Sequence, residues 1–243
     1  MMDLYSKNLV EIKDLYNSIP NVWPVNDKWH VYSKKYIHNY VYHYITQKSE
    51  KNIRILNAGS GGNTYNLVYP MIHIDVAEKK IENIPNSITT SIDETLPFES
   101  NYFDICICVG SVINYCNASK AIVEISRVLK NGASLVLEFE SSRSFEFLFQ
   151  KSYNKSRYQI IASYCNMEHL FWVYSKKYIL NLLQKENFTI TNVDHFHVLS
   201  SLINKIIKNE NITSMFSAFD RLLHKVPVIK EFSSNIILTC IKT

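Results

Sequence analysis

The sequence predicts an α/β fold built on a doubly wound, mostly parallel sheet, and three observations carry this prediction. From residue 53 onward, short apolar segments alternate with segments of helical pattern. The 243 residues include five glycines, and three of these fall in the window Gly59–Gly62, directly after the first apolar segment. Residues 103–110 are apolar at nearly every position, which is typical of a central parallel strand buried on both faces. Such alternation implies right-handed crossovers and helices on both faces of one sheet.

Length and composition set the outer limits of the interpretation. A chain of 243 residues can form one large domain, or one domain with an insertion. We expect a helical lid over residues 1–50, a second unit over 51–243, and an insertion above the sheet at about 141–174. With 47% hydrophobic and 20% charged residues, the chain is not of the disordered class. It has no apolar run of the ~18 residues that a membrane span needs, and no secretory signal, so we expect a cytoplasmic protein.

The N-terminal 50 residues are rich in aromatic side chains and predict two helices. Pro20 and Pro24 separate the first helix from a second one over Asp27–Gln47. In the second helix, Trp29, Tyr32, Tyr36 and Tyr40 recur every three or four residues and therefore share one face. This face either packs on the core or forms a lid whose rings contact a ligand. The sequence leaves both interpretations open.

The remaining elements follow from local patterns. We expect strands at residues 54–57, 71–75, 86–92, 103–110, 134–140, 188–198 and 235–241. We expect helices at 63–68, 117–130 and 175–186, and a long helical segment at 199–223, with Gly132 as a C-terminal helix cap. Cys106 and Cys108 lie within an apolar strand, where reduced, buried thiols are more usual than a disulfide or a metal pair, and we expect no metal site.

The glycine cluster is the first candidate for a ligand site. In open α/β sheets, ligands bind beyond the carboxyl ends of the strands, where Gly59–Gly62 and Asp75 both stand. Glycines allow the main chain to turn tightly against a nucleotide-like ligand, and a carboxylate after the second strand can accept both ribose hydroxyls. Thr64 occupies the place of the third glycine of the dinucleotide fingerprint, and no lysine completes a phosphate-binding loop.

A set of motifs further along the chain resembles a known family. Leu96-Pro97-Phe98 is followed by Phe103-Asp104, a strand, and Glu124-Ile125-Ser126-Arg127-Val128-Leu129-Lys130-Asn131-Gly132. The order and spacing of these pieces over about residues 50–140 resemble the class I S-adenosylmethionine-dependent methyltransferases, specifically the type 11 methyltransferase domain. The resemblance implies a Rossmann-like methyltransferase fold with a seven-stranded sheet and an antiparallel final strand. It also implies S-adenosyl-L-methionine as cofactor and S-adenosyl-L-homocysteine as product.

The resemblance assigns the cofactor contacts to four segments. These are Asn57, Ala58, Gly59, Ser60 and Gly61 around the methionine part, Asp75 and Val76 at the ribose and adenine, Ile92, Asp93 and Glu94 at the adenine edge, and Val109, Gly110 and Ser111 under the sulfonium. The sequence departs from the family pattern at three places. Asn57 replaces the usual acid, the helix after the loop (63–68) is short by about one turn, and Ile92 stands where an acid is usual, with Asp93 one place later.

Methyl transfer requires an aligned nucleophile, exclusion of water and, for some acceptors, a base. We therefore expect catalytic groups above the sheet, at His30, Tyr32, Tyr115 and Glu140. The expected acceptor-binding residues are Trp29, Tyr36, Asn114, His169 and Trp172. The tetrapeptide that amino-directed DNA methyltransferases carry after the fourth strand is absent, because the sequence there is Val112-Ile113-Asn114-Tyr115, so we expect no DNA acceptor.

The leading hypothesis is an enzyme that methylates an oxygen or nitrogen of a small molecule enclosed by aromatic residues. Three alternatives stay open. RNA or protein as the acceptor would require an open, basic face, although the net charge of +4 is spread along the chain. A quinone or lipid acceptor is suggested by the apolar residues at 203–223. A non-catalytic cofactor-binding module is suggested by Asn57 and the short helix. The oligomeric state is left open.

Overall fold

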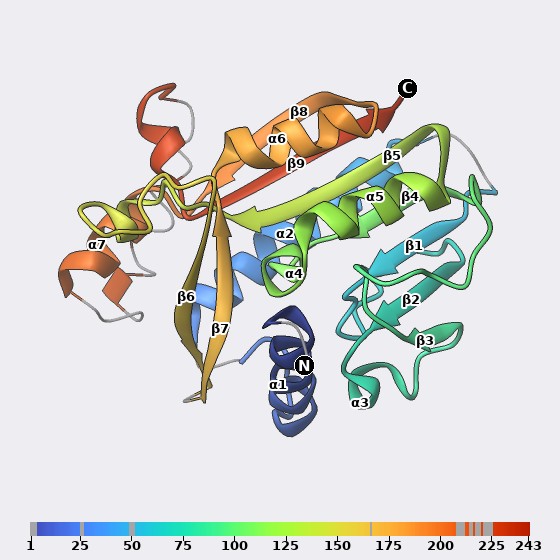
Figure 1. Cartoon of the computed structure of the whole chain (residues 1–243), viewed down its shortest axis with the longest axis horizontal. Coiled ribbons are helices and arrows are strands. Elements are labelled where there is room, and N and C mark those ends of the chain that lie inside the picture. The colour runs from blue at the N-terminus through green and yellow to red at the C-terminus, as the bar shows by residue number, and fades with distance from the viewer. Residues whose placement is uncertain are drawn as a thin grey trace.

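The structure, a computed structural model, describes residues 4–24, 27–48, 52–165, 167–207, 212–213, 216, 220 and 226–243. Figure 1 shows the arrangement of its helices and strands. In chain order these are α1 (Leu4–Ser18), α2 (Lys28–Thr46), β1 (Ile55–Ala58), β2 (Met71–Asp75), α3 (Glu78–Ile81), β3 (Ser87–Thr89), β4 (Phe103–Cys108), α4 (Val112–Tyr115), α5 (Ala118–Val128), β5 (Leu129–Glu140), η1 (Phe145–Phe147), β6 (Arg157–Tyr164), β7 (Met167–Tyr174), α6 (Lys176–Lys185), β8 (Phe188–Phe196), α7 (Leu199–Ile207), η2 (Ile229–Phe232) and β9 (Asn235–Lys242).

Seven strands form one mixed sheet in the order β3-β2-β1-β4-β5-β9-β8. The first five strands in this order pair with one another in parallel, and β9 is antiparallel to both β5 and β8. The prediction of a doubly wound, mostly parallel sheet with an antiparallel final strand is therefore confirmed. The strand order reverses between β1 and β4, and in such sheets a ligand binds beyond the carboxyl ends of the strands at this point.

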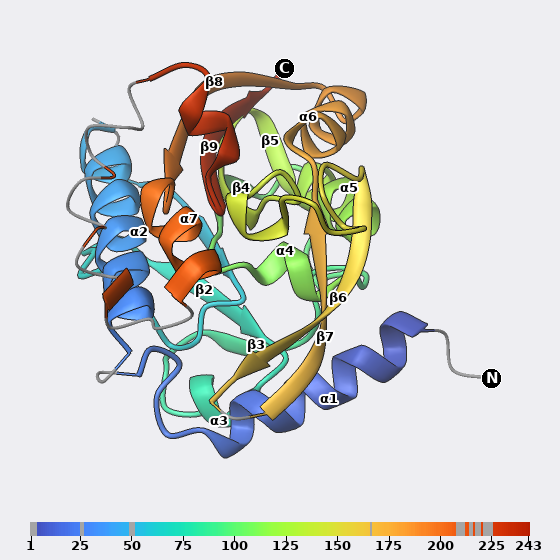
Figure 2. The ribbon, with the colours of Figure 1, turned by 90° about the vertical axis from the view of Figure 1, so that its left-hand side faces the viewer.

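Helices cover both faces of the sheet (Figure 2). The apolar sides of α5 and α6 pack on one face, where Ile122, Ile125 and Leu183 join a core with strand residues such as Leu135. The opposite face packs against α2, whose Ile37, Val41 and Ile45 are buried. Burial on both faces explains why the central strand β4 is apolar along most of its length.

The helix α2 begins and ends as its sequence predicts. Asp27 is its N-cap and accepts a hydrogen bond from the backbone N–H of His30, and Gln47 is its C-cap. Its aromatic residues are partly buried against the core beside the sheet. Tyr36 stacks on Phe196 with ring centroids 4.6 Å apart and donates a hydrogen bond to Asp194 at 2.7 Å. Over most of its length α2 is thus a packing helix, as the first interpretation of its aromatic face proposes.

The motif residues after β3 hold one another in place. Arg127 on α5 donates hydrogen bonds to the carbonyl oxygens of Phe98 and Leu96, at 2.8 and 3.1 Å. Glu124, one helical turn earlier, accepts from the backbone N–H of Leu96 at 2.7 Å and pairs with Arg127. The spacing of these motifs therefore reflects a loop that is hydrogen-bonded to a helix.

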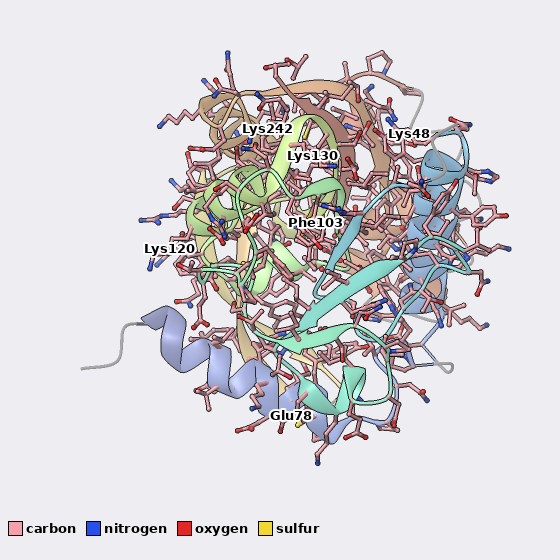
Figure 3. The ribbon with its side chains drawn as sticks, turned by 90° about the vertical axis from the view of Figure 1, so that its right-hand side faces the viewer. Lys48, Glu78, Phe103, Lys120, Lys130 and Lys242 are labelled. Carbon is pink, nitrogen blue, oxygen red and sulfur yellow. The ribbon has the colours of Figure 1, made fainter. Side chains whose placement is uncertain are left out.

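Figure 3 shows Lys130 and Lys242 at the side of the molecule away from Glu78 and α1, where Lys130 pairs with Asp104.

Residues 141–174, expected as an irregular insertion, contain a regular antiparallel hairpin of β6 and β7. His169, Phe171 and Val173 of β7 are buried, and the residues between them are exposed or partly exposed. This alternation is hard to see in the sequence because Leu170 and Trp172, on the other side of the strand, are also apolar. Figure 2 shows the hairpin reaching from the end of the sheet to α1, with which β7 is in contact.

Two local predictions are wrong, and a third gives the right element with bounds that are too wide. Residues 63–68 form turns, not a helix, and Tyr65 and Asn66 both have positive φ, which a right-handed helix excludes. Gly132 does not cap a helix, because α5 already ends at Val128 and Gly132 lies inside β5, where the pairing with β4 shifts register. The third strand is limited to Ser87–Thr89. Of the expected helix at 199–223, α7 covers Leu199–Ile207, and most of the rest lies outside the described residues.

Candidate functional site

Two adjoining cavities open at the carboxyl ends of the central strands. The first cavity encloses about 640 Å³ of empty space including its mouth, and the second about 970 Å³. They share the lining residues Tyr16, Val22, Gly110 and Tyr115, so they meet where α1, the loop after β4 and α4 come together.

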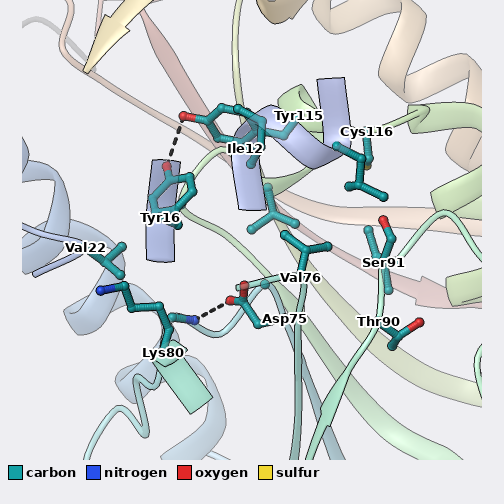
Figure 4. Close-up of a pocket in the computed structure, with 16 residues that line it drawn as sticks. Ile12, Tyr16, Val22, Asp75, Val76, Lys80, Thr90, Ser91, Tyr115 and Cys116 are labelled. Atoms are coloured by element: carbon teal, nitrogen blue, oxygen red, sulfur yellow. Dashed lines mark hydrogen bonds between the residues drawn. The ribbon is translucent and has the colours of Figure 1, made fainter. Parts of the chain in front are cut away.

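The first cavity has a carboxylate at one end and apolar walls. Asp75, the last residue of β2, accepts hydrogen bonds from the backbone N–H of Gly61 at 2.8 Å and of Ala77 at 2.9 Å. Burial raises the pKa of Asp75, although these hydrogen bonds oppose the shift. Ile12, Val76 and Ile92 supply apolar surface nearby (Figure 4). The cavity therefore offers a carboxylate that can accept hydrogen bonds, beside apolar walls between which a flat apolar group can fit.

The loop that lines the first cavity requires glycine, because a side chain does not fit at Gly59 or Gly62. Gly59 has a φ of +61°, and a Cβ atom there would lie 2.1 Å from Cγ2 of Val112. Gly62 has a φ of +78°, and its Cβ atom would lie 2.6 Å from the carbonyl oxygen of Lys80. Behind the loop, the amide oxygen Oδ1 of Asn57 is buried and has no hydrogen-bond partner among the described residues. A buried orphan acceptor beside a glycine loop is a place where a ligand donor can bind.

Helix α1 covers the first cavity. Leu9, Ile12 and Tyr16 line it, and Ile12, Leu15 and Ile19 are buried in a small cluster that also includes Tyr164 of the hairpin. The Nζ of Lys80 donates a hydrogen bond to the carbonyl oxygen of Ile19, just after the end of the helix. Tyr16 donates to the hydroxyl of Tyr115 at 3.0 Å (Figure 4), so α1 contributes a polar group at the junction of the two cavities.

The second cavity contains three carboxylates, Glu138, Glu140 and Glu146. Glu138 is fully buried and accepts hydrogen bonds from the backbone N–H groups of Gly110 and Ser111, at 2.9 and 2.6 Å, and from Asn235 at 2.8 Å. Its burial raises its pKa. By holding these two N–H groups, Glu138 fixes the turn after β4, where Gly110 and Ser111 both have positive φ.

Glu140 is more weakly held than Glu138. Ser111 Oγ donates to its Oε1 at 3.2 Å, and no other side-chain hydrogen bond reaches it from the described residues. Burial, helped by the neighbouring charges of Glu146 and Glu138, raises the pKa of Glu140 to about 8. A positive charge placed beside Glu140 would oppose this shift, because it favours the ionised carboxylate.

The comparisons with known proteins now identify the domain. Residues 56–137 match the family model described as "Methyltransferase domain". This stretch of the chain is a methyltransferase domain. The matched stretch of this methyltransferase domain runs from β1 into β5, and so includes the glycine loop, Asp75 and the turn after β4. No curated protein matches the chain in sequence.

Solved structures resemble the methyltransferase domain in fold at low sequence identity. The 1,6-didemethyltoxoflavin-N1-methyltransferase of Burkholderia thailandensis, solved with 1,6-didemethyltoxoflavin and S-adenosylhomocysteine, is 10% identical with a TM-score of 0.56, and the alignment covers 97% of this chain and 87% of that one. A SAM-dependent methyltransferase of Archaeoglobus fulgidus is 13% identical with a TM-score of 0.56, covering 86% and 95%. The [4+2]-cyclase SpnF is 14% identical with a TM-score of 0.53, covering 84% and 80%.

The toxoflavin-type methyltransferase of similar fold was solved with S-adenosylhomocysteine, and the residues of the first cavity fit a cofactor of this kind. Asp75 has a carboxylate that can accept hydrogen bonds from ribose hydroxyls, and Val76 and Ile92 provide apolar surface against which an adenine would fit. The buried Oδ1 of Asn57 lacks a partner, which suits a cofactor donor group. Asn57 replaces the acid that is usual at this place, and an amide oxygen can also accept a hydrogen bond.

Six of the thirteen predicted cofactor residues line the first cavity. These are Gly59, Gly61, Asp75, Val76, Ile92 and Gly110. Ser111 lines the second cavity, Ser60 and Val109 line a small side pocket together with Lys34, and Asn57 and Ala58 are buried behind the loop. Asp93 is engaged elsewhere: it accepts hydrogen bonds from Ser91 and from the backbone N–H of Asn117. The lining segment is Thr90–Ile92, so Asp93 and Glu94 fall just beyond it.

The structure divides the predicted catalytic and acceptor residues into two groups. His30, Trp29, Tyr115, Glu140 and His169 line the second cavity. Tyr32 and Tyr36 instead line a separate depression on the outer side of α2. Asn114 is fully buried and bridges β5 to β7 through the backbone of Glu140 and of Trp172, and Trp172 packs against the core beside α5 and α6.

Sequence reasoning missed several lining residues, namely Tyr16, Val22, Trp23, Lys80, Glu138, Glu146, Tyr164 and Phe171. One of them had a readable signal. Glu138 stands two residues before Glu140 in an apolar strand, so both side chains leave the strand on the same side at its carboxyl end. The others come from α1, its connection to α2, and the hairpin, whose position over the sheet depends on tertiary packing.

Proposed function

We propose that the protein transfers a methyl group from S-adenosylmethionine to an oxygen or nitrogen atom of a small molecule held in the second cavity. The observation that carries the proposal is the pair of cavities that meet at Tyr16, Gly110 and Tyr115. One cavity has the glycine loop and Asp75, and the other has aromatic rings and carboxylates. A methyl donor in the first would face an acceptor in the second.

The cofactor, when bound, supplies a methyl group that is already activated on sulfur. The protein's own contributions are to bind, to orient and to exclude water. Asp75 and the loop Gly59–Gly61 would hold the cofactor, and Glu138 fixes the turn at Gly110 and Ser111 on which the reacting groups would rest. Tyr16 of α1 bounds the junction between the two cavities, where it donates a hydrogen bond to Tyr115.

Glu140 and His169 are the candidate bases. Both line the second cavity, and a pKa of about 8 places Glu140 close to the range in which a carboxylate exchanges protons at neutral pH. Burial lowers the pKa of His169, which keeps the imidazole neutral and able to accept a proton. His30 is paired with Asp27 at the mouth of the same cavity.

Enclosure of the second cavity favours a small acceptor over a macromolecule. The start of α2, the hairpin strands β6 and β7, and Tyr16 of α1 surround it. The residues described around it include three glutamates and neither lysine nor arginine, the opposite of what an RNA acceptor requires. The toxoflavin-type methyltransferase of similar fold acts, by its name, at a nitrogen of a small molecule. Among the described residues, no helix is long and apolar enough to cross a membrane.

The first test is cofactor binding to an Asp75→Ala variant. A hydrogen bond to a charged group contributes about 1.5–3 kcal/mol, so the variant should bind S-adenosylhomocysteine about 10- to 100-fold more weakly in calorimetry. Glu82→Ala, an exposed acid after α3, is the matched control and should leave the affinity unchanged. Equal affinity of the Asp75→Ala variant and the unaltered protein would contradict the assignment of the first cavity.

The acceptor class is tested by supplying the protein with S-adenosylmethionine that carries a labelled methyl group, together with fractionated cell extract. Label in the small-molecule fraction supports the proposal. Label in RNA, protein or lipid, or cofactor binding with no transfer to any fraction, would replace it with one of the alternatives.

A further inference from the structure

The charged side chains that line the second cavity, apart from its histidines, are all carboxylates. Glu138, Glu140 and Glu146 bring carboxylates, and no lysine or arginine stands among the described lining residues. Glu138 is already saturated by three donors from the protein. Glu140 is not, because Ser111 Oγ is its one side-chain donor in the described part of the chain. An incoming ligand therefore meets Glu140 as the carboxylate with unused accepting capacity.

A second acceptor comes from the hairpin. His169 is 5% exposed and lines the cavity. Its Nδ1 lies 3.4 Å from the carbonyl oxygen of Met167, so Nδ1 carries the proton and Nε2 is left as a bare acceptor. A ligand that satisfies both Glu140 and His169 must be a donor.

Aromatic rings line the cavity in a connected belt. His30 lies 4.8 Å from Tyr164 between ring centroids, Tyr164 lies 6.1 Å from Tyr16, and Tyr16 lies 5.8 Å from Tyr115. Phe171 continues the belt 4.9 Å from Tyr115. The negative faces of such rings attract cations, and aromatic cages bind alkylammonium groups in this way. The aromatic belt and the Glu140 carboxylate therefore both favour a positively charged ligand.

We propose that the second cavity takes a small molecule bearing a protonated amine, held between Glu140 and the aromatic belt, and that this amine nitrogen is the atom methylated. This inference rests on the proposed function and narrows its acceptor class from oxygen or nitrogen to amine nitrogen.

The transfer balances with groups that the cavity provides. The ammonium gives one proton to the Glu140 carboxylate, which frees the nitrogen lone pair. The lone pair attacks the methyl carbon, a C–N bond forms, and the C–S bond breaks with its electron pair staying on sulfur. The nitrogen keeps one positive charge in the methylated product, and Glu140 returns its proton to solvent. No oxidant, reductant or metal is required.

Three probes that differ in their head group test the charge preference. We would titrate 2-phenylethylamine, 2-phenylethanol and 3-phenylpropionate into the protein saturated with S-adenosylhomocysteine, at pH 7. Trp23 and Trp29 line the cavity, so quenching of tryptophan fluorescence reports binding. The amine should bind at least ~10-fold more tightly than the alcohol, and the acid should bind most weakly. Equal or tighter binding of the alcohol or the acid overturns the proposal.

Two variants assign the preference to Glu140. Glu140→Gln keeps the side-chain size and an acceptor for Ser111 but removes the charge, so it should bring the amine to the affinity of the alcohol. Glu168→Gln, an exposed acid on the same hairpin, should keep the full preference. If the preference survives in Glu140→Gln, or is lost equally in Glu168→Gln, Glu140 is not the amine's partner and the proposal fails.

The same titrations separate failure of this inference from failure of the proposed function. Binding of S-adenosylhomocysteine is measured first, in each variant, and also shows that the variant is folded. Cofactor binding with no preference for the amine overturns the amine assignment and leaves methyl transfer in place. Absence of cofactor binding in the unaltered protein would instead contradict the proposed function itself.

Discussion

At the scale of single residues, Gly59 gives the sharpest test of the loop geometry. Substitution by alanine would place Cβ at 2.1 Å from Cγ2 of Val112, in addition to the strain of a residue at φ +61°. We expect Gly59→Ala to lower the free energy of unfolding by several kcal/mol, since strain costs about 1–2 kcal/mol and overpacking about 1–3 kcal/mol. Urea unfolding measures this loss.

Gly132 provides the matched control, because its φ is +81° but its Cβ atom would meet nothing within 4 Å. Gly132→Ala should therefore cost the strain alone, about 1–2 kcal/mol. Adding Val112→Ala to Gly59→Ala should recover part of the loss, because the double variant removes the clashing methyl groups. Equal costs at the two glycines, with no recovery in the double variant, would contradict the close approach of Val112.

A second prediction for a single residue concerns Glu140 and the dependence of the free energy of unfolding on pH. Its pKa is about 8 in the folded protein against 4.5 for an ordinary glutamate, so the folded state binds the proton more tightly than the unfolded state. The stabilisation from this proton is complete below pH 4.5 and is lost as pH rises towards 8. In that window Glu140 lowers the free energy of unfolding by up to about 1.4 kcal/mol per pH unit.

The Glu140→Gln variant isolates this contribution, since Glu138 and Asp75 also have raised pKa values and add to the slope. Urea unfolding between pH 6 and pH 8 should show a smaller loss of stability in the variant than in the unaltered protein. Glu168→Gln should follow the unaltered protein. Parallel curves for all three proteins would mean that Glu140 titrates normally.

At the scale of elements, local chemistry decides what the sequence predicts well. Asp27 and Ser175 each cap a helix that begins at the next residue, and the apolar run of β4 can hardly be anything but a buried strand. The glycine loop and Asp75 were predictable for the same reason, since both follow directly from adjacent strands. The wrong helix at 63–68 shows the limit, because Tyr65 and Asn66 adopt positive φ within a turn whose backbone N–H groups pair with Asn63 and Thr64.

Elements brought together by tertiary packing were not predictable in the same way. The sequence places α1 beside α2 in the chain, yet α1 lies against α3, α4 and β7. The hairpin of β6 and β7 was expected to be irregular, although His169 and Phe171 on its inner side line the second cavity. The roles of Tyr16 and Tyr164 depend on these positions, and no local pattern encodes them.

Helix α1 carries a prediction of its own, because it covers the first cavity with Leu9, Ile12 and Tyr16. A ligand in that cavity would bury these side chains further and make opening of the helix less favourable. Saturating S-adenosylhomocysteine should slow amide hydrogen exchange in α1 by about 10-fold or more. Helix α6, on the far side of the core, is the internal control and should slow only as much as global stability rises. Unchanged exchange in α1 would contradict its role as a cover.

At the scale of the whole molecule, the core that α2 shares with the sheet limits the proposed division into an N-terminal lid (residues 1–50) and a methyltransferase unit (51–243). Ile37, Val41 and Ile45 of α2 belong to the same buried cluster as Ile55 and Ile107 of the sheet. Removing α2 would expose one face of the central strands. We therefore propose that the lid consists of α1 and the turn after it, because α2 belongs to the core that supports the site.

This shared core predicts that α2 and the sheet unfold together. In a Trp172→Phe background, in which Trp23 and Trp29 are the remaining tryptophans, fluorescence follows the start of α2 and far-ultraviolet circular dichroism follows the whole fold, so the two urea transitions should coincide. Ile45→Ala should move both transitions equally, by about 2–5 kcal/mol, because Ile45 is fully buried. Tyr42→Ala, on the exposed side of α2, should change either transition little. An earlier fluorescence transition, or one that Ile45→Ala moves alone, would show that α2 folds as part of an independent lid.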